Sequence, residues 1–299
     1  MSADLLRDLM RAIPGGVLRE VTIECAPGTV SAQTAASWVN CGVNRVSLGV
    51  QSFVAAEIER TGRRHTAETV ASDIETLRRN KIENINIDLI AGLPRQTADS
   101  WRASLEWIDR LAPEHVSVYV FEMDDRSRLG KEALHGGDRY GADELPDDGA
   151  TADLYSSAVE RLAQLGYRRY EISNFARPGF ESRHNLKYWR LEPYVGFGAG
   201  AHSFDGKKRW SNAEDLTTYM LGKGRRKAID ADLSEERFFI GLRLLDGIEP
   251  SEAEWTRFAA PVKKWVAAGM LERSGNNLRL SNDAVLLSNE IFQDFLCPA

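Results

Sequence analysis

Cysteine is scarce in this chain. Only Cys25, Cys41 and Cys297 occur among 299 residues, and their wide spacing and odd number exclude a disulfide framework and a CxxC metal clip. We expect reduced, mostly buried thiols. A long apolar run is also missing, because the first residues interleave acids and bases with leucines, unlike a signal peptide or a membrane-spanning segment. The sequence therefore predicts a cytoplasmic protein without a transmembrane segment.

An excess of positive charge is absent too. The formal net charge of -6 argues against a general nucleic-acid binder, which needs a basic field to displace counterions from phosphates. One local basic cluster interrupts this pattern, formed by Lys207, Lys208, Arg209, Arg225, Arg226 and Lys227. It is interpreted as a solvated linker, although it could also attract propionates or another anionic group.

Strand-type runs alternate with helical patterns in the first half of the chain, which is typical of parallel βαβ units. The length suggests roughly two domains. The expected strands are Val21 to Cys25, Arg45 to Gln51, Asn84 to Ile90 and Val116 to Glu122. Helices are expected over Leu5 to Ile13, after the N-caps Ser31, Thr66 and Thr97, and over Asp147 to Leu165.

The expected strands have chemically unequal faces, because residues two apart share a face. Thr22 and Glu24 share one face of the first strand. Polar or small residues likewise share a face in the next two, namely Ser47, Gly49, Gln51, Asn84, Asn86 and Asp88. A doubly covered parallel sheet has near-continuous apolar strands. The pattern instead favours a partial (β/α) barrel with a polar lumen and a polar, cationic ligand. The alternative is a solvated face of an open antiparallel sheet.

The second half of the chain carries weaker signals. The glycines between Tyr194 and His202 indicate a tight loop, since GxGxG without a flanking strand and helix is weak evidence of phosphate binding. From Asp232 onward the pattern predicts short helices and a hairpin over Leu271 to Leu280, a winged-helix-like arrangement. This part holds seven Lys plus Arg and eleven Asp plus Glu, so its charge of 7 − 11 = −4 argues against DNA binding.

The segment Tyr170 to Trp189, YEISNFARPGFESRHNLKYW, combines aromatic rings, a turn at Pro178-Gly179 and a histidine beside an amide. Its two flanks are expected to fold back toward one another and to place His184 between aromatic side chains, which would suit a flat apolar ligand. A hydrogen-bonded structural histidine is the alternative.

Several motifs occur in a fixed order: VTIECAPGT, NRVSLGVQSF, GRRH, NINIDLIAGLPRQT, YEISNFARPG and HNLKYW. With them the chain resembles the HemW-type heme chaperones, which are radical S-adenosylmethionine relatives of oxygen-independent coproporphyrinogen III oxidase. HNLKYW fits the HNxxYW motif that separates the chaperones from the oxidases. The resemblance implies an α/β fold, with a partial radical SAM barrel over residues 1–231 and a small helical domain over residues 232–299.

The resemblance also implies ligands. Glu24, Gln51, Arg63 and Asp88 match the positions that hold S-adenosylmethionine. His184 matches the heme-linked residue and is implied to bind the heme iron, in agreement with the use of imidazole as an axial ligand. Asn185, Tyr188 and Trp189 are expected to orient or stack on the heme, although Tyr188 and Trp189 can equally be core aromatics.

The chain departs from the family at its cluster-binding loop. The family's CxxxCxxC motif, whose thiolates hold a [4Fe-4S] cluster, does not occur, nor does the preceding GGGTPS strand end. We therefore expect that Met1 is not a natural domain start, that Val21 to Cys25 is an uncovered sheet edge, and that radical cleavage is absent. The leading functional hypothesis is heme delivery to an acceptor protein. The alternatives are a radical decarboxylase of coproporphyrinogen and an inert fragment.

Overall fold

The computed structural model describes residues 3–13, 16, 18–60, 62–123, 128–137, 141–224 and 228–296. The chain divides into two compact units. The first holds Met1–Arg169 and Ser173–Glu181, and the second holds Tyr170–Ile172 and Ser182–Ala299. The predicted domain boundary after residue 231 lies inside the second unit, and this assignment of family domains stays a prediction. Arg225, Arg226, Lys227 and Cys297 lie outside the described residues.

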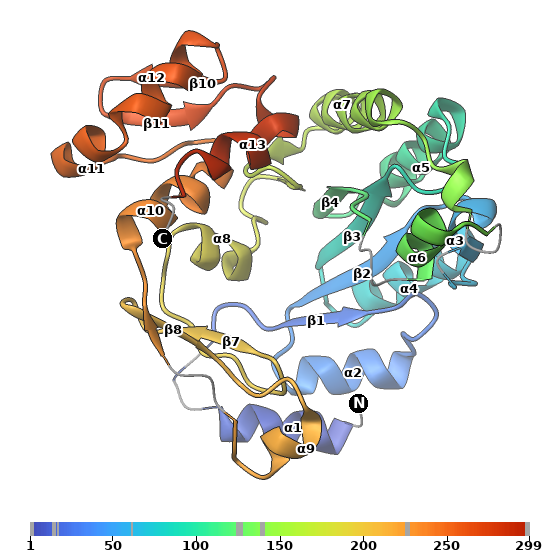
Figure 1. Ribbon diagram of the computed structural model, residues 1–299. Helices are drawn as coiled ribbons and strands as arrows, with labels where there is room; N and C mark the ends of the chain where they lie inside the picture. Colours follow the sequence, from blue (N-terminus) through green and yellow to red (C-terminus); the bar gives the residue numbers. More distant parts are fainter. Residues whose placement is uncertain are drawn as a thin grey trace. The chain divides into compact units, whose positions relative to one another are not determined.

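The first unit is built on one six-stranded sheet with the order β1-β2-β3-β4-β6-β5. Figure 1 labels its first four strands, β1 to β4. Strands β1 to β4 are parallel, and β6 and β5 continue the sheet in antiparallel pairing. The elements of this unit are α1 (Ala3–Ala12), β1 (Thr22–Cys25), α2 (Ala32–Asn40), β2 (Arg45–Gln51), α3 (Ala55–Arg60), α4 (Ala67–Arg79), β3 (Asn84–Ala91), α5 (Ala98–Leu111), β4 (His115–Val120), α6 (Arg128–His135), η1 (Ala142–Glu144), α7 (Asp148–Gln164), β5 (Arg168–Arg169) and β6 (Asn174–Ala176).

The core of this unit lies between one face of the sheet and its helices. The inward residues of the central strands have no exposed surface, as Val46, Leu48, Ile85, Ile87 and Val116 show. The helices supply matching apolar stripes, such as Val70, Ile74 and Leu77 on α4 and Trp101, Leu105 and Ile108 on α5. Burying a side chain of this size stabilises the fold by roughly 1.5–3 kcal/mol. The apolar alternation in the strands therefore holds the helices on one face and leaves the polar face for other contacts.

Local sequence signals explain where the helices begin. The side chains of Ser31, Thr66 and Thr97 accept hydrogen bonds from backbone N–H groups in the first turns of α2, α4 and α5, as the sequence predicts.

The α/β fold with a parallel sheet is confirmed. The sheet is open, since the strands in the described parts of the chain do not close into a barrel. Strand β1 stands at its edge, as expected.

The second unit combines a small sheet, a hairpin and short helices. Its sheets are the three strands β7-β8-β9 and the pair β10-β11. Its elements are α8 (Arg183–Trp189), β7 (His202–Phe204), β8 (Lys208–Ser211), α9 (Leu216–Met220), β9 (Ile229–Asp230), α10 (Leu233–Phe239), η2 (Gly241–Arg243), α11 (Glu252–Arg257), α12 (Ala259–Ala267), β10 (Leu271–Ser274), β11 (Asn277–Leu280), η3 (Val285–Leu287) and α13 (Ser288–Gln293).

An aromatic core organises the C-terminal part of this unit. Phe238 packs with its ring centroid 4.4 Å from that of Phe258 and 4.8 Å from that of Phe295. The predicted hairpin is confirmed, with Leu271 paired to Leu280, and the capping box of Ser251 and Glu254 begins α11. The winged-helix interpretation stays a prediction. Among the described helices, none is both long and apolar enough to cross a membrane.

Candidate functional sites

The polar face of the large sheet carries a row of aligned side chains. Glu24 of β1 is paired in register with Ser47 of β2, Ser47 with Asn86 of β3, and Asn86 with His115 of β4. One pleat further, Asp88 pairs with Ser117. Glu24 is exposed, whereas Ser47, Asn86, His115 and Ser117 are buried. Glu24, Ser47, Asn86 and Asp88 therefore share the face on which the sequence placed them, whereas Gln51 lies beyond an irregularity in the pairing and is paired with Leu89.

Asp88 is held by hydrogen bonds on both carboxylate oxygens. The Ser47 hydroxyl donates to Oδ2 at 3.0 Å, and the Asn86 amide donates to Oδ1 at 2.7 Å. The same amide nitrogen also donates to the Ser47 hydroxyl at 2.8 Å. Two hydrogen bonds to the two oxygens of a carboxylate fix its orientation. Asp88 is thus presented as an oriented carboxylate on a rigid sheet.

His115, the first residue of β4, belongs to the same network. Its Nδ1 lies 2.6 Å from Oδ1 of Asn86, and the Ser117 hydroxyl donates to the same oxygen at 3.2 Å. Because an amide oxygen accepts only, Nδ1 of His115 must carry the proton. Complete burial, reinforced by the positive charge of Arg45, lowers the pKa of His115 well below its usual value. The imidazole is therefore neutral, and the donor and the acceptor of each of these hydrogen bonds are consistent with one another. The sequence analysis missed His115 because it placed the strand start at Val116.

Gln51 and Arg63 meet at the carboxyl end of β2. Nη1 of Arg63 donates to the Gly49 carbonyl oxygen at 2.8 Å. A Cβ atom at Gly49 would lie 3.2 Å from Nε2 of Gln51 and 3.6 Å from Nη1 of Arg63, so glycine leaves room for both side chains. Gln51 itself has a positive φ of 69°, at the irregularity in the pairing of β2 with β3. Ser47, which donates a hydrogen bond to Asp88, belongs to the same strand as Gly49 and Gln51. Strand β2 therefore connects the Gln51 and Arg63 side chains to the Asp88 network.

A buried network joins the loops that follow β2 and β3. The Ser52 hydroxyl donates to Glu57 at 2.6 Å, and the Gln96 amide donates to the same carboxylate oxygen at 3.1 Å. Gln96 also accepts from the backbone N–H of Gly92 at 2.6 Å. These contacts fix the chain just beyond Gln51 and Asp88. The sequence analysis did not single them out, because polar residues in loops carry no periodic signal.

In the second unit, HNLKYW forms the helix α8, and Ser182 caps it by accepting from the Asn185 backbone N–H at 3.2 Å. His184 and Tyr188 are four residues apart and lie on one side of the helix. Their ring centroids are 4.8 Å apart, edge to face, and the ring of Tyr188 is 4.5 Å from that of Tyr194. Burial, and then the neighbouring Tyr194, raise the pKa of Tyr188. The exposed His184 imidazole thus stands beside a chain of aromatic rings.

Trp189 is the last residue of α8. The guanidinium of Arg243 is 4.5 Å from the centre of its ring, and Nη2 of Arg243 is 3.6 Å from the buried carboxylate of Glu171. The indole nitrogen of Trp189 is buried and makes no hydrogen bond within the described part of the chain. These contacts favour the core-aromatic alternative for Trp189. Asn185 is only partly buried, and its role stays a prediction.

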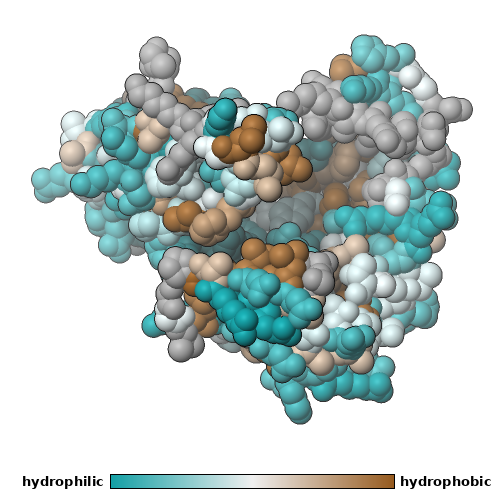
Figure 2. All heavy atoms as spheres, turned by 90° about the horizontal axis from the view of Figure 1, so that it is seen from below, coloured by the Kyte–Doolittle hydropathy of each residue, from teal (hydrophilic) through white to brown (hydrophobic). Residues whose placement is uncertain are grey.

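The glycine-rich segment after Tyr194 is a tight loop, as predicted. A Cβ atom at Gly196 would lie 2.2 Å from the His202 carbonyl oxygen, so only glycine fits there. The Asn212 amide donates to the carbonyl oxygens of Gly196 at 3.2 Å and Gly198 at 2.9 Å. The loop exposes the side chains of Val195 and Phe197, by 63% and 71%. Figure 2 shows one face of the molecule, on which apolar residues gather in several patches among hydrophilic ones.

Comparison with known proteins places the chain in a family. The Radical SAM superfamily pattern matches residues 2–108. The heme chaperone HemW of Lactococcus lactis is 32% identical, with 99% of this chain and 81% of that protein covered. The heme chaperone HemW of Bacillus subtilis is also 32% identical, with coverage of 99% and 82%. The chain belongs to the HemW family.

A HemW protein from Escherichia coli is 28% identical over 98% of this chain and 79% of its own length. Among solved structures, coproporphyrinogen III oxidase HemN from Escherichia coli, described as a radical SAM enzyme, aligns with a TM-score of 0.82. That alignment covers 98% of this chain and 73% of the enzyme at 20% identity, so the likeness concerns the fold. The predicted radical SAM architecture and the predicted HemW-type membership are both confirmed.

The cysteines of this HemW-family chain do not fit an iron–sulfur cluster. Cys25 ends β1, and burial raises the pKa of its thiol to about 11, which opposes the thiolate form that binds iron. Cys41 follows the end of α2. No group of three or more His, Cys, Asp or Glu side chains that could hold a metal occurs among the residues described. The residues present therefore do not provide the family's cluster site.

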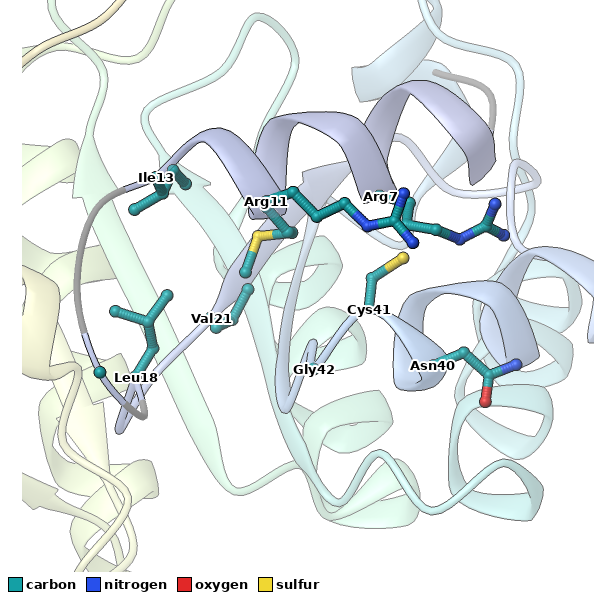
Figure 3. A pocket seen from close by; sticks show the side chains of 10 residues that line it. Arg7, Arg11, Ile13, Leu18, Val21, Asn40, Cys41 and Gly42 are labelled. Atoms are coloured by element: carbon teal, nitrogen blue, oxygen red, sulfur yellow. The ribbon is translucent and has the colours of Figure 1, made fainter.

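One cavity of about 510 Å³ lies in the first unit, between α1, the start of β1 and the end of α2 (Figure 3). Arg7, Arg11 and Cys41 line it beside the apolar Ile13 and Val21. Arg7 pairs with Asp4 at 2.8 Å and Arg11 approaches Asp8 at 3.9 Å. Both arginines therefore have an acidic neighbour within α1.

Proposed function

We propose that this chain is a heme-binding chaperone that delivers heme to an acceptor protein. The observation that carries the proposal is the position of HNLKYW on α8, with an exposed His184 imidazole beside the rings of Tyr188 and Tyr194. Imidazole is a common axial ligand of heme iron, and aromatic rings suit the flat macrocycle. The names of the related HemW proteins support the same function.

The residues of α8 would then have different tasks. His184 would bind the iron, and Tyr188 would contact the porphyrin with its ring while Tyr194 supports it from the opposite side. Asn185, one residue beyond His184, is close enough in sequence to orient the heme or its ligand. Trp189 would act indirectly, because its stacking on Arg243 holds the end of α8 in place. No contact with a heme is needed for that role.

On the sheet, Glu24, Gln51, Arg63 and Asp88 would hold S-adenosylmethionine, the cofactor after which the superfamily is named. The two carboxylates suit an amino group or a ribose, and the Arg63 guanidinium suits the methionyl carboxylate. Asp88 is already oriented by Ser47 and Asn86. No reaction step is assigned to this cofactor, because the chain does not provide the thiolates of a cluster.

The alternative, radical decarboxylation of coproporphyrinogen, needs that cluster to generate a radical. The cysteine content of the chain argues against it, and the likeness to the oxidase concerns the fold alone. Product analysis with coproporphyrinogen III under anaerobic, reducing conditions separates the two functions. We expect unchanged substrate, and decarboxylated product would favour the oxidase.

The role of His184 is tested by titrating the chain with hemin and recording the Soret band. We expect His184→Ala to shift or abolish the band and to weaken binding about tenfold or more, because the iron loses a protein ligand. His202→Ala is the matched control, since His202 is another exposed histidine of the same unit. Equal spectra and affinities for wild type and His184→Ala would show that His184 does not bind the iron.

A further inference from the structure

A second group of polar side chains lies on the same face of the sheet as Asp88, at the opposite ends of the strands. Thr22, Arg45 and Asn84 are the first residues of β1, β2 and β3, and they are paired in register across the three strands. Because neighbouring strands are about 4.8 Å apart, the three side chains form a compact row. The row lies two residues before the level of Glu24, Ser47 and Asn86.

Arg45 is the centre of this row and is nearly completely buried, with 5% of its surface exposed. Its Nε atom is buried without a hydrogen-bond partner, whereas its Nη1 and Nη2 atoms are not among the buried unpaired atoms of the described residues. An arginine cannot discard its charge at physiological pH. A buried and unpaired charge costs several kcal/mol, so a protein keeps one only where something else compensates it.

The neighbours of Arg45 do not supply that compensation. Oγ1 of Thr22 and Oδ1 of Asn84 are also buried without a hydrogen-bond partner in the part of the chain that the structure describes. His115 is kept neutral, partly by the charge of Arg45 itself. Three adjacent polar groups thus have unused hydrogen-bonding capacity around a net positive charge. In folded proteins such groups are almost always paired, which points to a missing partner.

We propose that Thr22, Arg45 and Asn84 form a binding site for the carboxylate group of a small organic acid. A carboxylate carries a single negative charge and matches the single positive charge of Arg45, with which it can form two parallel hydrogen bonds. The Thr22 hydroxyl can donate a further bond, and so can the Asn84 amide after a turn about its last bond. A phosphate dianion would leave one negative charge uncompensated.

This site differs from the one assigned to S-adenosylmethionine. Its central group is a cation at the amino ends of the strands, whereas Glu24 and Asp88 are acidic and lie further along them. The polar face therefore offers opposite charges at two levels, suited to a ligand pair or to one ligand with a carboxylate at its end. The carboxylate site does not depend on heme binding by α8, and the two can be tested separately.

The test uses sodium propionate as the probe, with sodium chloride at equal ionic strength as the reference. We expect propionate to raise the Tm of the wild-type chain and to give saturation-transfer signals in NMR. In Arg45→Met both effects should vanish, with affinity reduced about ten- to a hundredfold, because a charge-assisted hydrogen-bonding partner is lost. Arg102→Met, at an exposed arginine of α5, should respond as the wild type does.

If Arg45 had a purely structural role, Arg45→Met would lower the Tm in chloride, without propionate. The carboxylate-site proposal predicts the opposite. Replacing an unpaired buried charge by an apolar side chain should leave the Tm in chloride unchanged or higher, so a lower Tm or an unfolded Arg45→Met protein would overturn the proposal. Thr22→Val, a milder change, should keep the Tm in chloride and still weaken propionate binding. Equal propionate responses in wild type and Thr22→Val, or stabilisation by phosphate and not by propionate, would also contradict it.

Discussion

Individual polar residues give the large sheet its chemical character. Asp88, Asn86 and Ser47 are joined by hydrogen bonds to one another, and His115 joins the network from β4. Each of these bonds restricts the orientation of the side chains that it connects. Thr22, Arg45 and Asn84 at the other ends of the strands differ, because one buried polar atom of each has no hydrogen-bond partner among the described residues. The first group is oriented by its own hydrogen bonds, and the second group forms the proposed carboxylate site.

The neutral state of His115 predicts a pH dependence. Since its pKa in the folded protein lies well below the usual value of 6.5, the unfolded chain binds a proton at this residue before the folded chain does. The stability linked to His115 is fully present above about pH 6.5 and falls by about 1.4 kcal/mol per pH unit below it. Urea unfolding at a series of pH values, compared between wild type and His115→Asn, measures this contribution.

The variant serves as the control for all other titrating groups. We expect the stability difference between wild type and His115→Asn to be constant above neutral pH and to shrink as the pH falls below about 6.5. Parallel curves over the whole range would mean that His115 takes up its proton in the folded state and that its neutral role in the network is wrong.

Among the helices and strands, those with a periodic sequence pattern were predicted well, and those with an irregular pattern were not. Strand β2 has the expected bounds, Arg45–Gln51, because apolar and polar residues alternate along it. Strand β4 begins at His115, one residue early, since a buried histidine does not look like a strand residue. The flank His184 to Trp189, expected as one side of a folded-back turn, is the helix α8. The capping contact of Ser182, only two residues before His184, is the signal that could have indicated this.

The arrangement of side chains on the polar face could be predicted only in part, for the same reason. Strand alternation places Glu24 and Asp88 on one face, whereas the approach of Arg63 to Gly49 depends on the chain path after β2. Arg45 shares the parity of Ser47, but a charged first residue of a strand is usually solvated, so sequence alone gives no reason to single it out. Its burial and its missing partner are visible only in three dimensions.

The loop that presents Phe197 depends on one glycine. In Gly196→Ala the new Cβ would lie 2.2 Å from the backbone oxygen of His202, which only a backbone shift can relieve. We expect a loss of roughly 1–3 kcal/mol in the free energy of unfolding. Gly200→Ala should cost less, about 1 kcal/mol, because its positive φ is unfavourable but the nearest side-chain atom is 3.9 Å away. Equal losses in thermal unfolding would contradict this view of the loop.

At the scale of the whole molecule, two compact units carry two different candidate sites. The first unit provides a parallel sheet with an oriented carboxylate and a buried cation, and the second provides the α8 histidine with its aromatic neighbours. The similarity to HemW proteins extends over 99% of the chain and includes both units.

The central claim, that this chain binds heme, is tested most directly by equilibrium titration of the wild-type chain with hemin. The Soret difference spectrum should rise and saturate at one heme per chain, and the loaded chain should pass its heme to an excess of an apo-hemoprotein. A linear rise without saturation, as for heme that adheres to any apolar surface, or no spectral change at all, would contradict the account.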